Sequence, residues 1–172
     1  MSEQAVMSSP KEQILSAYAR EHATTMRVLR AYPNDKLDLR PHAMCKTARE
    51  LAWVFAVERG LGSFAFNNGL ASGAPPGGMP EAPESWDDLL SAIEKAHADY
   101  EQMIRSTSDQ DLTKPIKFFG GPQKLVDIPR LQLLWAMLFD EIHHRGQFSI
   151  YLRMAGGKVP SIYGPTADEP WN

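Results

Sequence analysis

The chain has 172 residues, of which 43% are hydrophobic and 23% charged; this composition is typical of one globular domain and excludes a disordered chain. Its 18 basic residues are outnumbered by 21 acidic ones, so no basic excess is available to bind the phosphates of a nucleic acid. A single cysteine excludes a disulfide framework and a multi-cysteine zinc site within the chain. The polar N-terminus lacks the apolar region of a signal peptide, and no segment approaches the roughly 20 apolar residues that cross a bilayer. We therefore expect a cytoplasmic protein that binds neither membrane nor nucleic acid.

Two helices are predicted in the first half of the chain, over residues 10–31 and 47–67. The first segment starts with a proline, whose missing N–H is not needed in a first helical turn. Thr47 and Glu50 have the spacing of a capping box ahead of an apolar run, which predicts the start of the second helix. Residues 67–84 are rich in proline and glycine and cannot continue a helix.

Two further helices are predicted over residues 85–106 and 129–155. Ser85 is the expected N-cap of the first of these. Residues 129–155 are apolar almost all round, which predicts a helix buried at the centre of the fold. The connection between the two helices, residues 106–127, contains a strand-like run at residues 116–119 that is too brief to imply a sheet.

Four helices of roughly 20 residues would each be about 30 Å long. Joined by long connections, they predict an all-α fold, a four-helix bundle with at least one long crossover, in a single domain over residues 1–172. A globin-like packing of the same helices is the alternative. The sequence contains no haem attachment motif that would support it.

Glu58 is a charged residue at a position expected to be buried. At 100° per residue it lies about 40° from Val54, within the apolar stripe that Leu51 and Leu61 mark on the second helix. A buried carboxylate is costly unless it is paired, hydrogen-bonded or bound to a metal. The competing interpretation is an ion pair with an arginine, or an approach to solvent at the end of the bundle.

Asp140 and His144 lie four residues apart on the last predicted helix, on a face that also carries Leu133 and Met137. This face should therefore point inward. A carboxylate and an imidazole at this spacing suit a shared metal ion, although a simple hydrogen bond is the more common role of such a pair. His143 points about 100° away from His144, so it is expected to be a supporting or interface residue and not a ligand of the same ion.

Together, Glu58, Asp140 and His144 predict a divalent-metal site between the second and the last helix, since bundles build metal sites from inward-facing side chains on neighbouring helices. Three protein ligands leave positions open for water or substrate, which is typical of a catalytic site. His22 and His97 fall on apolar faces of their helices, and we interpret them as core residues and not as ligands.

Three stretches of the sequence resemble the DinB-like family of metalloenzymes, and the likeness covers nearly the whole chain. They are residues 47–53, residues 139–147 with 151–153, and residues 159–169. The resemblance implies a four-helix bundle of up-down-down-up topology, usually dimeric. It also implies a site of three histidines, one on the second helix and an H-x-x-x-H pair on the last. Characterised relatives of this family are transferases and isomerases that depend on low-molecular-weight thiols.

This sequence departs from the family's histidine pattern at two of three positions. Val54 stands where the family has the histidine of the second helix, and it cannot bind a metal. Asp140 replaces the first histidine of the last helix, and only His144 is kept. Glu58, one turn after Val54 on the same face, is the expected substitute. The candidate cofactors are Mn, Fe, Ni and Zn, and the oxygen-rich ligand set favours harder ions such as Mn, Fe or Mg.

Two functions of different classes are consistent with these observations. The first is a divalent-metal-dependent enzyme, a thiol-dependent transferase or a hydrolase, with a degenerate metal site. The second is a non-catalytic bundle without metal, in which Glu58 and His144 only hydrogen-bond to each other, and which binds a partner or a small ligand. A homodimer is expected, because Trp53, Trp135 and Phe139 would lie on exposed helix faces in a monomer.

Overall fold

The helices begin where the sequence offers capping side chains. The computed structural model describes residues 8–71, 73, 75, 77–78 and 80–171. In it, Ser9 and Thr47 each close a capping box with the glutamate three residues on, and Ser85 accepts a hydrogen bond from the Asp88 N–H. The four long helices, all predicted from the sequence, are α1 (Pro10–Arg30), α2 (Ala48–Asn68), α3 (Trp86–Ser106) and α5 (Arg130–Met154).

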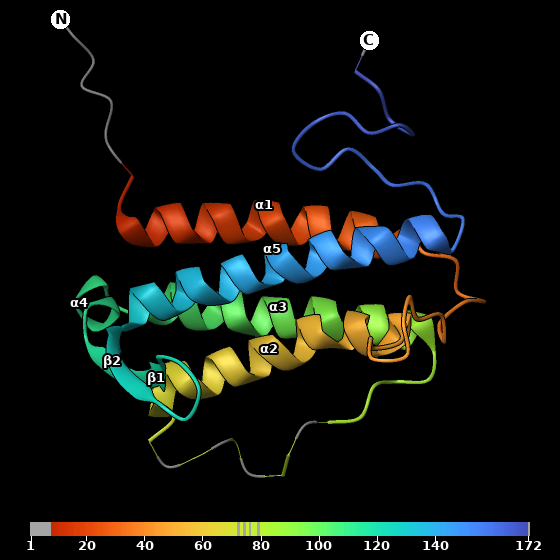
Figure 1. The fold of residues 1–172 in the computed structure, drawn as a ribbon. Helices are drawn as coiled ribbons and strands as arrows, with labels where there is room; N and C mark the ends of the chain where they lie inside the picture. Colours follow the sequence, from red (N-terminus) through yellow and green to blue (C-terminus); the bar gives the residue numbers. More distant parts are fainter. Residues whose placement is uncertain (1–7, 72, 74, 76, 79, 172) are drawn as a thin grey trace, which may run out of the picture.

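The four long helices lie side by side, α1 and α5 running in one direction and α2 and α3 in the other (Figure 1). Each packs against two others, in the cyclic order α1, α3, α2, α5. Since α2 and α3 follow each other in the chain and run in parallel, the connection between them travels back along the bundle. The predicted four-helix bundle with up-down-down-up topology is thus confirmed, and the helices do not adopt the globin-like alternative.

The core of the bundle consists of two apolar clusters with a layer of buried polar groups between them. One cluster lies where α1 and α5 end and contains Leu29, Phe55, Ile93 and Phe148. The other lies toward the opposite end of the bundle and includes Ile14, Ile104 and Leu134 among its members. The polar layer between the clusters adjoins the candidate site described below; its members are Glu21, Thr25, Arg59, Glu141 and Arg145.

The connection from α3 to α5 is more structured than the sequence predicted. It holds a short helix, α4 (Asp109–Leu112), and two antiparallel strands, β1 (Pro115–Phe119) and β2 (Leu125–Pro129). The expectation that residues 116–119 imply no sheet is therefore wrong. A five-residue strand gives only a weak signal in the sequence, because its stability depends on the strand it pairs with. Here Lys117 of β1 forms an ion pair with Asp127 of β2, at 2.6 Å.

Gly69 places the hairpin against the end of α2 (Figure 1). It ends the helix with a φ of 67°, a conformation that favours glycine. A Cβ at this position would lie 3.2 Å from the backbone nitrogen of Lys117. The next residue, Leu70, donates its N–H to the Lys117 carbonyl at 2.8 Å, so the turn joins α2 directly to β1.

The outer face of α5 carries exposed apolar side chains, namely Phe139, Ile150 and Met154. The prediction that this helix is buried at the bundle centre is therefore wrong, because α5 packs against α1 and α2 along its length and against α4 and the hairpin near its start, which leaves its outer face uncovered. Of the aromatic residues expected on exposed faces, Phe139 is exposed, whereas Trp53 and Trp135 are half-buried. Within the described residues, no helix combines the length and apolarity needed to cross a membrane.

His22 and His97 stack on each other at the contact of α1 with α3. Their ring centroids are 3.5 Å apart and their planes differ by 4°. His97 also stacks on the Tyr18 ring, at 4.7 Å. His97 is buried and His22 half-buried, and both lie outside the cluster formed by the predicted metal ligands.

Acid is expected to weaken this stack. Burial lowers the pKa of His22 to about 3 and that of His97 to about 4, from an ordinary 6.5, and the nearby Arg59 adds to both shifts. Between pH 6.5 and about 4, both imidazoles stay neutral in the folded protein but bind protons in the unfolded chain. The free energy of unfolding therefore falls progressively as the pH is lowered through this range. The urea midpoint should therefore be lower at about pH 5 than at about pH 7.5. His97→Phe keeps the stacking without titrating and should show a smaller drop; equal drops in the two proteins would contradict this account.

Candidate metal centre

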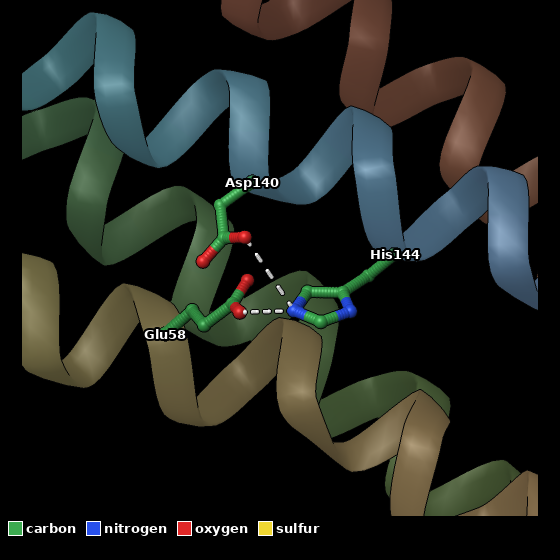
Figure 2. A group of neighbouring side chains, drawn as sticks. All are labelled: Glu58, Asp140 and His144. Carbon is green, nitrogen blue, oxygen red and sulfur yellow. Dashed lines mark ion pairs between the residues drawn. The ribbon is translucent and has the colours of Figure 1, made fainter. Parts of the chain in front are cut away.

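Glu58 of α2 and Asp140 and His144 of α5 meet where the two antiparallel helices pack together (Figure 2). The Nε2 atom of His144 lies 2.8 Å from Glu58 Oε1 and 3.6 Å from Asp140 Oδ1. One potential ligand atom of each residue lies within 4.8 Å of the others. The structure thus brings together the three residues that the helical periodicity singled out.

Asp140 is more exposed than the sequence predicted. Its side chain is 49% exposed, compared with 14% for Glu58 and 19% for His144. The periodicity of α5 correctly placed Asp140 and His144 on one face. It could not show that this face opens onto a cleft at Asp140 instead of being covered by another helix.

The cleft beside these residues has a volume of about 880 Å³ and runs between α2 and α5 to the hairpin. Val54, the residue at the family's histidine position, lines it one turn before Glu58. Its wall is mainly apolar and is built by side chains from α2, α5, β1 and the connection that follows α2. The apolar members include Trp53, Val57, Leu61, Phe118, Met137 and Phe139.

Glu58 and His144 hold protons more firmly than usual. Burial raises the pKa of the Glu58 carboxyl, and the nearby Asp140 adds to this shift. The hydrogen bond to Glu58 raises the pKa of His144. Both shifts favour the protonated forms, so a cation that binds between Glu58 Oε1 and His144 Nε2 would compete with protons for these groups.

Gln147 orients the imidazole of His144. Its Oε1 lies 3.1 Å from His144 Nδ1, and its Nε2 lies 2.9 Å from His143 Nε2. The amide oxygen can only accept, so the Nδ1–H of His144 donates the hydrogen bond to Gln147 Oε1. Neutral His144 then keeps its lone pair on Nε2, the atom that faces the two carboxylates. His143 is exposed and acts on His144 only through Gln147.

A second pair of charges lies directly behind the site, inside the bundle. Arg59, the residue after Glu58, pairs with Glu141, the residue after Asp140, at 3.1 Å. Arg59 also donates to the Phe55 carbonyl at 2.5 Å, and Thr25 donates to Glu141 at 2.8 Å. Burial disfavours the charge of Arg59, and the Glu141 carboxylate offsets this effect, so the pKa of Arg59 is raised. On α2, Glu58 thus faces the cleft and Arg59 faces the core. On α5, Asp140 faces the cleft and Glu141 faces the core.

Sequence reasoning missed Gln147, Arg59 and Glu141 as supporting residues. The periodicity places Gln147 on the face of His144, which is the one signal that could have found it. Arg59 and Glu141 each follow a predicted ligand and lie about 100° from it around the helix axis. Their pairing depends on how α2 and α5 are rotated against each other, which a single sequence does not show.

Three solved structures have a similar fold. One is a DinB-like protein from Bacillus cereus, with a TM-score of 0.69 at 22% identity; the match covers 88% of this chain and 97% of that one. Another is the DinB-like protein YjoA from Bacillus subtilis, with a TM-score of 0.69 at 20% identity; the match covers 88% of this chain and 96% of that one. The third is YfiT from Bacillus subtilis, with a TM-score of 0.65 at 14% identity, covering 92% of this chain and 95% of that one. YfiT is described as a probable metal-dependent hydrolase with an unusual four-helix bundle topology. At these identities the likeness shows the fold.

Sequence comparison extends over nearly the whole chain. The uncharacterized protein YrdA of Bacillus subtilis (strain 168) is 26% identical over 159 residues, which are 92% of this chain and 90% of YrdA. The model of the DinB family matches residues 7–171. The protein therefore belongs to the DinB family.

Proposed function

We propose that this protein is a divalent-metal-dependent hydrolase whose ion is held by Glu58, Asp140 and His144. The observation that carries the proposal is the convergence of these three side chains in the wall of an open cleft. Three ligands in contact with solvent leave positions for water and substrate, which is typical of catalytic sites. The description of YfiT, a structural relative, as a probable metal-dependent hydrolase supports the same reaction class.

The residues present fit a divalent ion. Two carboxylates and one imidazole can compensate its charge, and Gln147 leaves the lone pair of His144 directed at the carboxylates. Because carboxylates favour Mn and Mg while imidazole favours Fe, Ni and Zn, Mn and Fe suit this mixed set best. Val54 contributes no ligand; it forms part of the apolar wall next to the site.

A bound divalent ion supplies Lewis acidity and lowers the pKa of a water in the same site. Glu58 and His144 would hold the ion from the buried side of the cleft, and Asp140 would hold it from the open side. The remainder of the cleft is walled mainly by apolar side chains. Apart from the three ligands, the charged residues in the described part of its lining are Lys46 and Glu50. We therefore favour a hydrolase over a transferase for a small polar thiol, which would leave most of this wall without a partner.

The proposal is tested by removing the metal with a chelator, reloading with Mn, Fe, Ni or Zn, and assaying a panel of p-nitrophenyl esters. Hydrolysis should depend on reloading. Since a bound metal supplies several kcal/mol of charge stabilisation, Glu58→Gln should lower kcat/KM by about a hundredfold or more. Glu94→Gln, which changes an exposed glutamate of α3 in the same way, is the matched control and should stay active. Turnover of no ester by the reloaded protein, or full turnover by Glu58→Gln, would contradict the proposal.

Gln147→Ala should weaken metal binding by about tenfold to a hundredfold, because partners that orient a ligating histidine typically have effects of this size. Calorimetric titration of metal-free protein with Mn or Zn measures the change. Gln147→Glu keeps an oxygen acceptor for the Nδ1 proton and should bind more tightly than the alanine variant. Gln132→Ala, on an exposed position of the same helix, is the control. An unchanged affinity in Gln147→Ala would show that this hydrogen bond does not position His144.

A further inference from the structure

The cleft beside the candidate metal centre differs in character along its length. Toward the start of α2 it is lined by Lys46 and Glu50. Toward the hairpin it is lined by Leu61 of α2 and by Phe118 and Phe119 of β1. A ligand that extends from the site toward the hairpin meets only apolar side chains among the described lining residues, whereas one that extends the other way passes Trp53, Val54 and Val57 and then reaches the charged Lys46 and Glu50.

The apolar part of the cleft begins directly at the metal ligands. Leu61 follows Glu58 by three residues, which is about 4.5 Å along the helix axis. On α5, Met137 and Ala136 precede Asp140 by three and four residues and line the same end of the cleft. Beyond these residues of α2 and α5, Phe118 and Phe119 of the hairpin continue the apolar wall. A group bonded to an atom held at the metal would reach this wall without a polar spacer.

The rim of the cleft exposes large apolar side chains, each in contact with one neighbouring ring: Phe119 with Phe118 and Phe139 with Trp135. Phe119 is 58% exposed and Phe139 61% exposed, and both line the cleft. Trp53 is held by a hydrogen bond from its Nε1 to the Pro80 carbonyl at 2.7 Å, so its ring is fixed in the wall. A volume of about 880 Å³ lies in the range of sites that enclose small organic molecules.

From this arrangement we propose that the substrate is an ester or amide with an unbranched apolar acyl chain, which lies along the wall toward the hairpin while the carbonyl group sits at Glu58, Asp140 and His144. This inference rests on the proposed hydrolase function and names its substrate class. Hydrolysis adds water across the bond from the carbonyl carbon to the leaving oxygen or nitrogen, and releases a carboxylic acid and an alcohol or amine. A polyanion or a sugar is disfavoured, because the first meets three carboxylates in the cleft and the second meets a wall that is mainly apolar.

The proposal is tested by the binding of straight-chain hydroxamic acids, from acetohydroxamic to octanohydroxamic acid, to the metal-loaded protein. Their head group binds metals, so the series varies only the apolar chain. If the wall accepts the chain, affinity should rise by about fourfold for each added methylene group that is buried. Calorimetry gives the affinities, and sedimentation of the same samples gives the oligomeric state.

Matched variants locate the chain. Phe119→Ala removes an exposed side chain at the hairpin end of the cleft and should weaken octanohydroxamic acid more than acetohydroxamic acid. Ile150→Ala removes an equally exposed apolar side chain of α5 outside this cleft and should change neither. Flat affinities across the series would overturn the proposal. So would a stable dimer in which a second copy covers the rim and excludes the longer probes.

The same titrations separate the two proposals. If metal-free and metal-loaded proteins bind the hydroxamic acids equally well and affinity still rises with chain length, the metal centre fails and the apolar site stands. If binding needs the metal but ignores chain length, the metal centre stands and the substrate class is wrong.

Discussion

Glu141→Ala is expected to lower the free energy of unfolding by about 3–5 kcal/mol, because removing one partner of a buried ion pair leaves the other charge without compensation. Glu141 and Arg59 are 3% and 5% exposed, and they pair at 3.1 Å in the polar layer of the core. The substitution also removes the acceptor of the Thr25 hydroxyl. Urea unfolding followed by circular dichroism would show the loss as a lower midpoint at an unchanged m-value.

Two further variants make this result specific. Glu94→Ala breaks an exposed ion pair with Arg30 and should cost at most about 1 kcal/mol. Arg59→Met combined with Glu141→Leu replaces the pair by apolar groups and should recover much of the stability lost in the single variant. A loss below about 1 kcal/mol in Glu141→Ala would show that the pair is not a main support of the bundle behind the candidate site.

His144→Ala should weaken metal binding by at least about a hundredfold. Four-ligand zinc sites bind with roughly 10–16 kcal/mol, or about 3 kcal/mol for each ligand, and a loss of 3 kcal/mol is somewhat more than a hundredfold. His144 is central to the cluster, since its Nε2 faces both carboxylates (Figure 2). Calorimetric titration and plasma mass spectrometry of the purified protein measure the affinity and the retained metal.

The neighbouring histidine provides the control. His143→Ala removes an exposed imidazole that contacts Gln147 and lies outside the cluster, so it should cost no more than about tenfold. Equal losses in the two variants would mean that the effect arises from helix α5 as a whole and not from a ligand at position 144.

Local signals were sufficient to predict the helices and the residues of the candidate site. Thr47 and Ser85 mark helix starts in the sequence and cap helices in the structure. The angle between successive residues placed Asp140 and His144 on one face, and a carboxylate at an apolar position drew attention to Glu58. These inferences depend on one helix at a time, which is why a single sequence supports them.

Features that depend on how elements pack could not be predicted in the same way. The β-hairpin is formed by two short strands that gain support from the end of α2. The exposure of Phe139 follows from the place of α5 in the bundle, although the helix is apolar almost all round. The pairing of Arg59 with Glu141 depends on the rotation of α2 against α5. The cleft is built by four segments far apart in the chain, so no local pattern contains it.

The central claim is that Glu58, Asp140 and His144 hold one divalent ion. The most direct test is a crystal structure of the protein loaded with Zn or Mn, with anomalous diffraction data collected on both sides of the metal's absorption edge. The account predicts one strong anomalous peak between α2 and α5, about 2.0–2.2 Å from His144 Nε2 and from an oxygen of each carboxylate. A peak at other residues, or none in crystals of protein saturated with the metal, would contradict it.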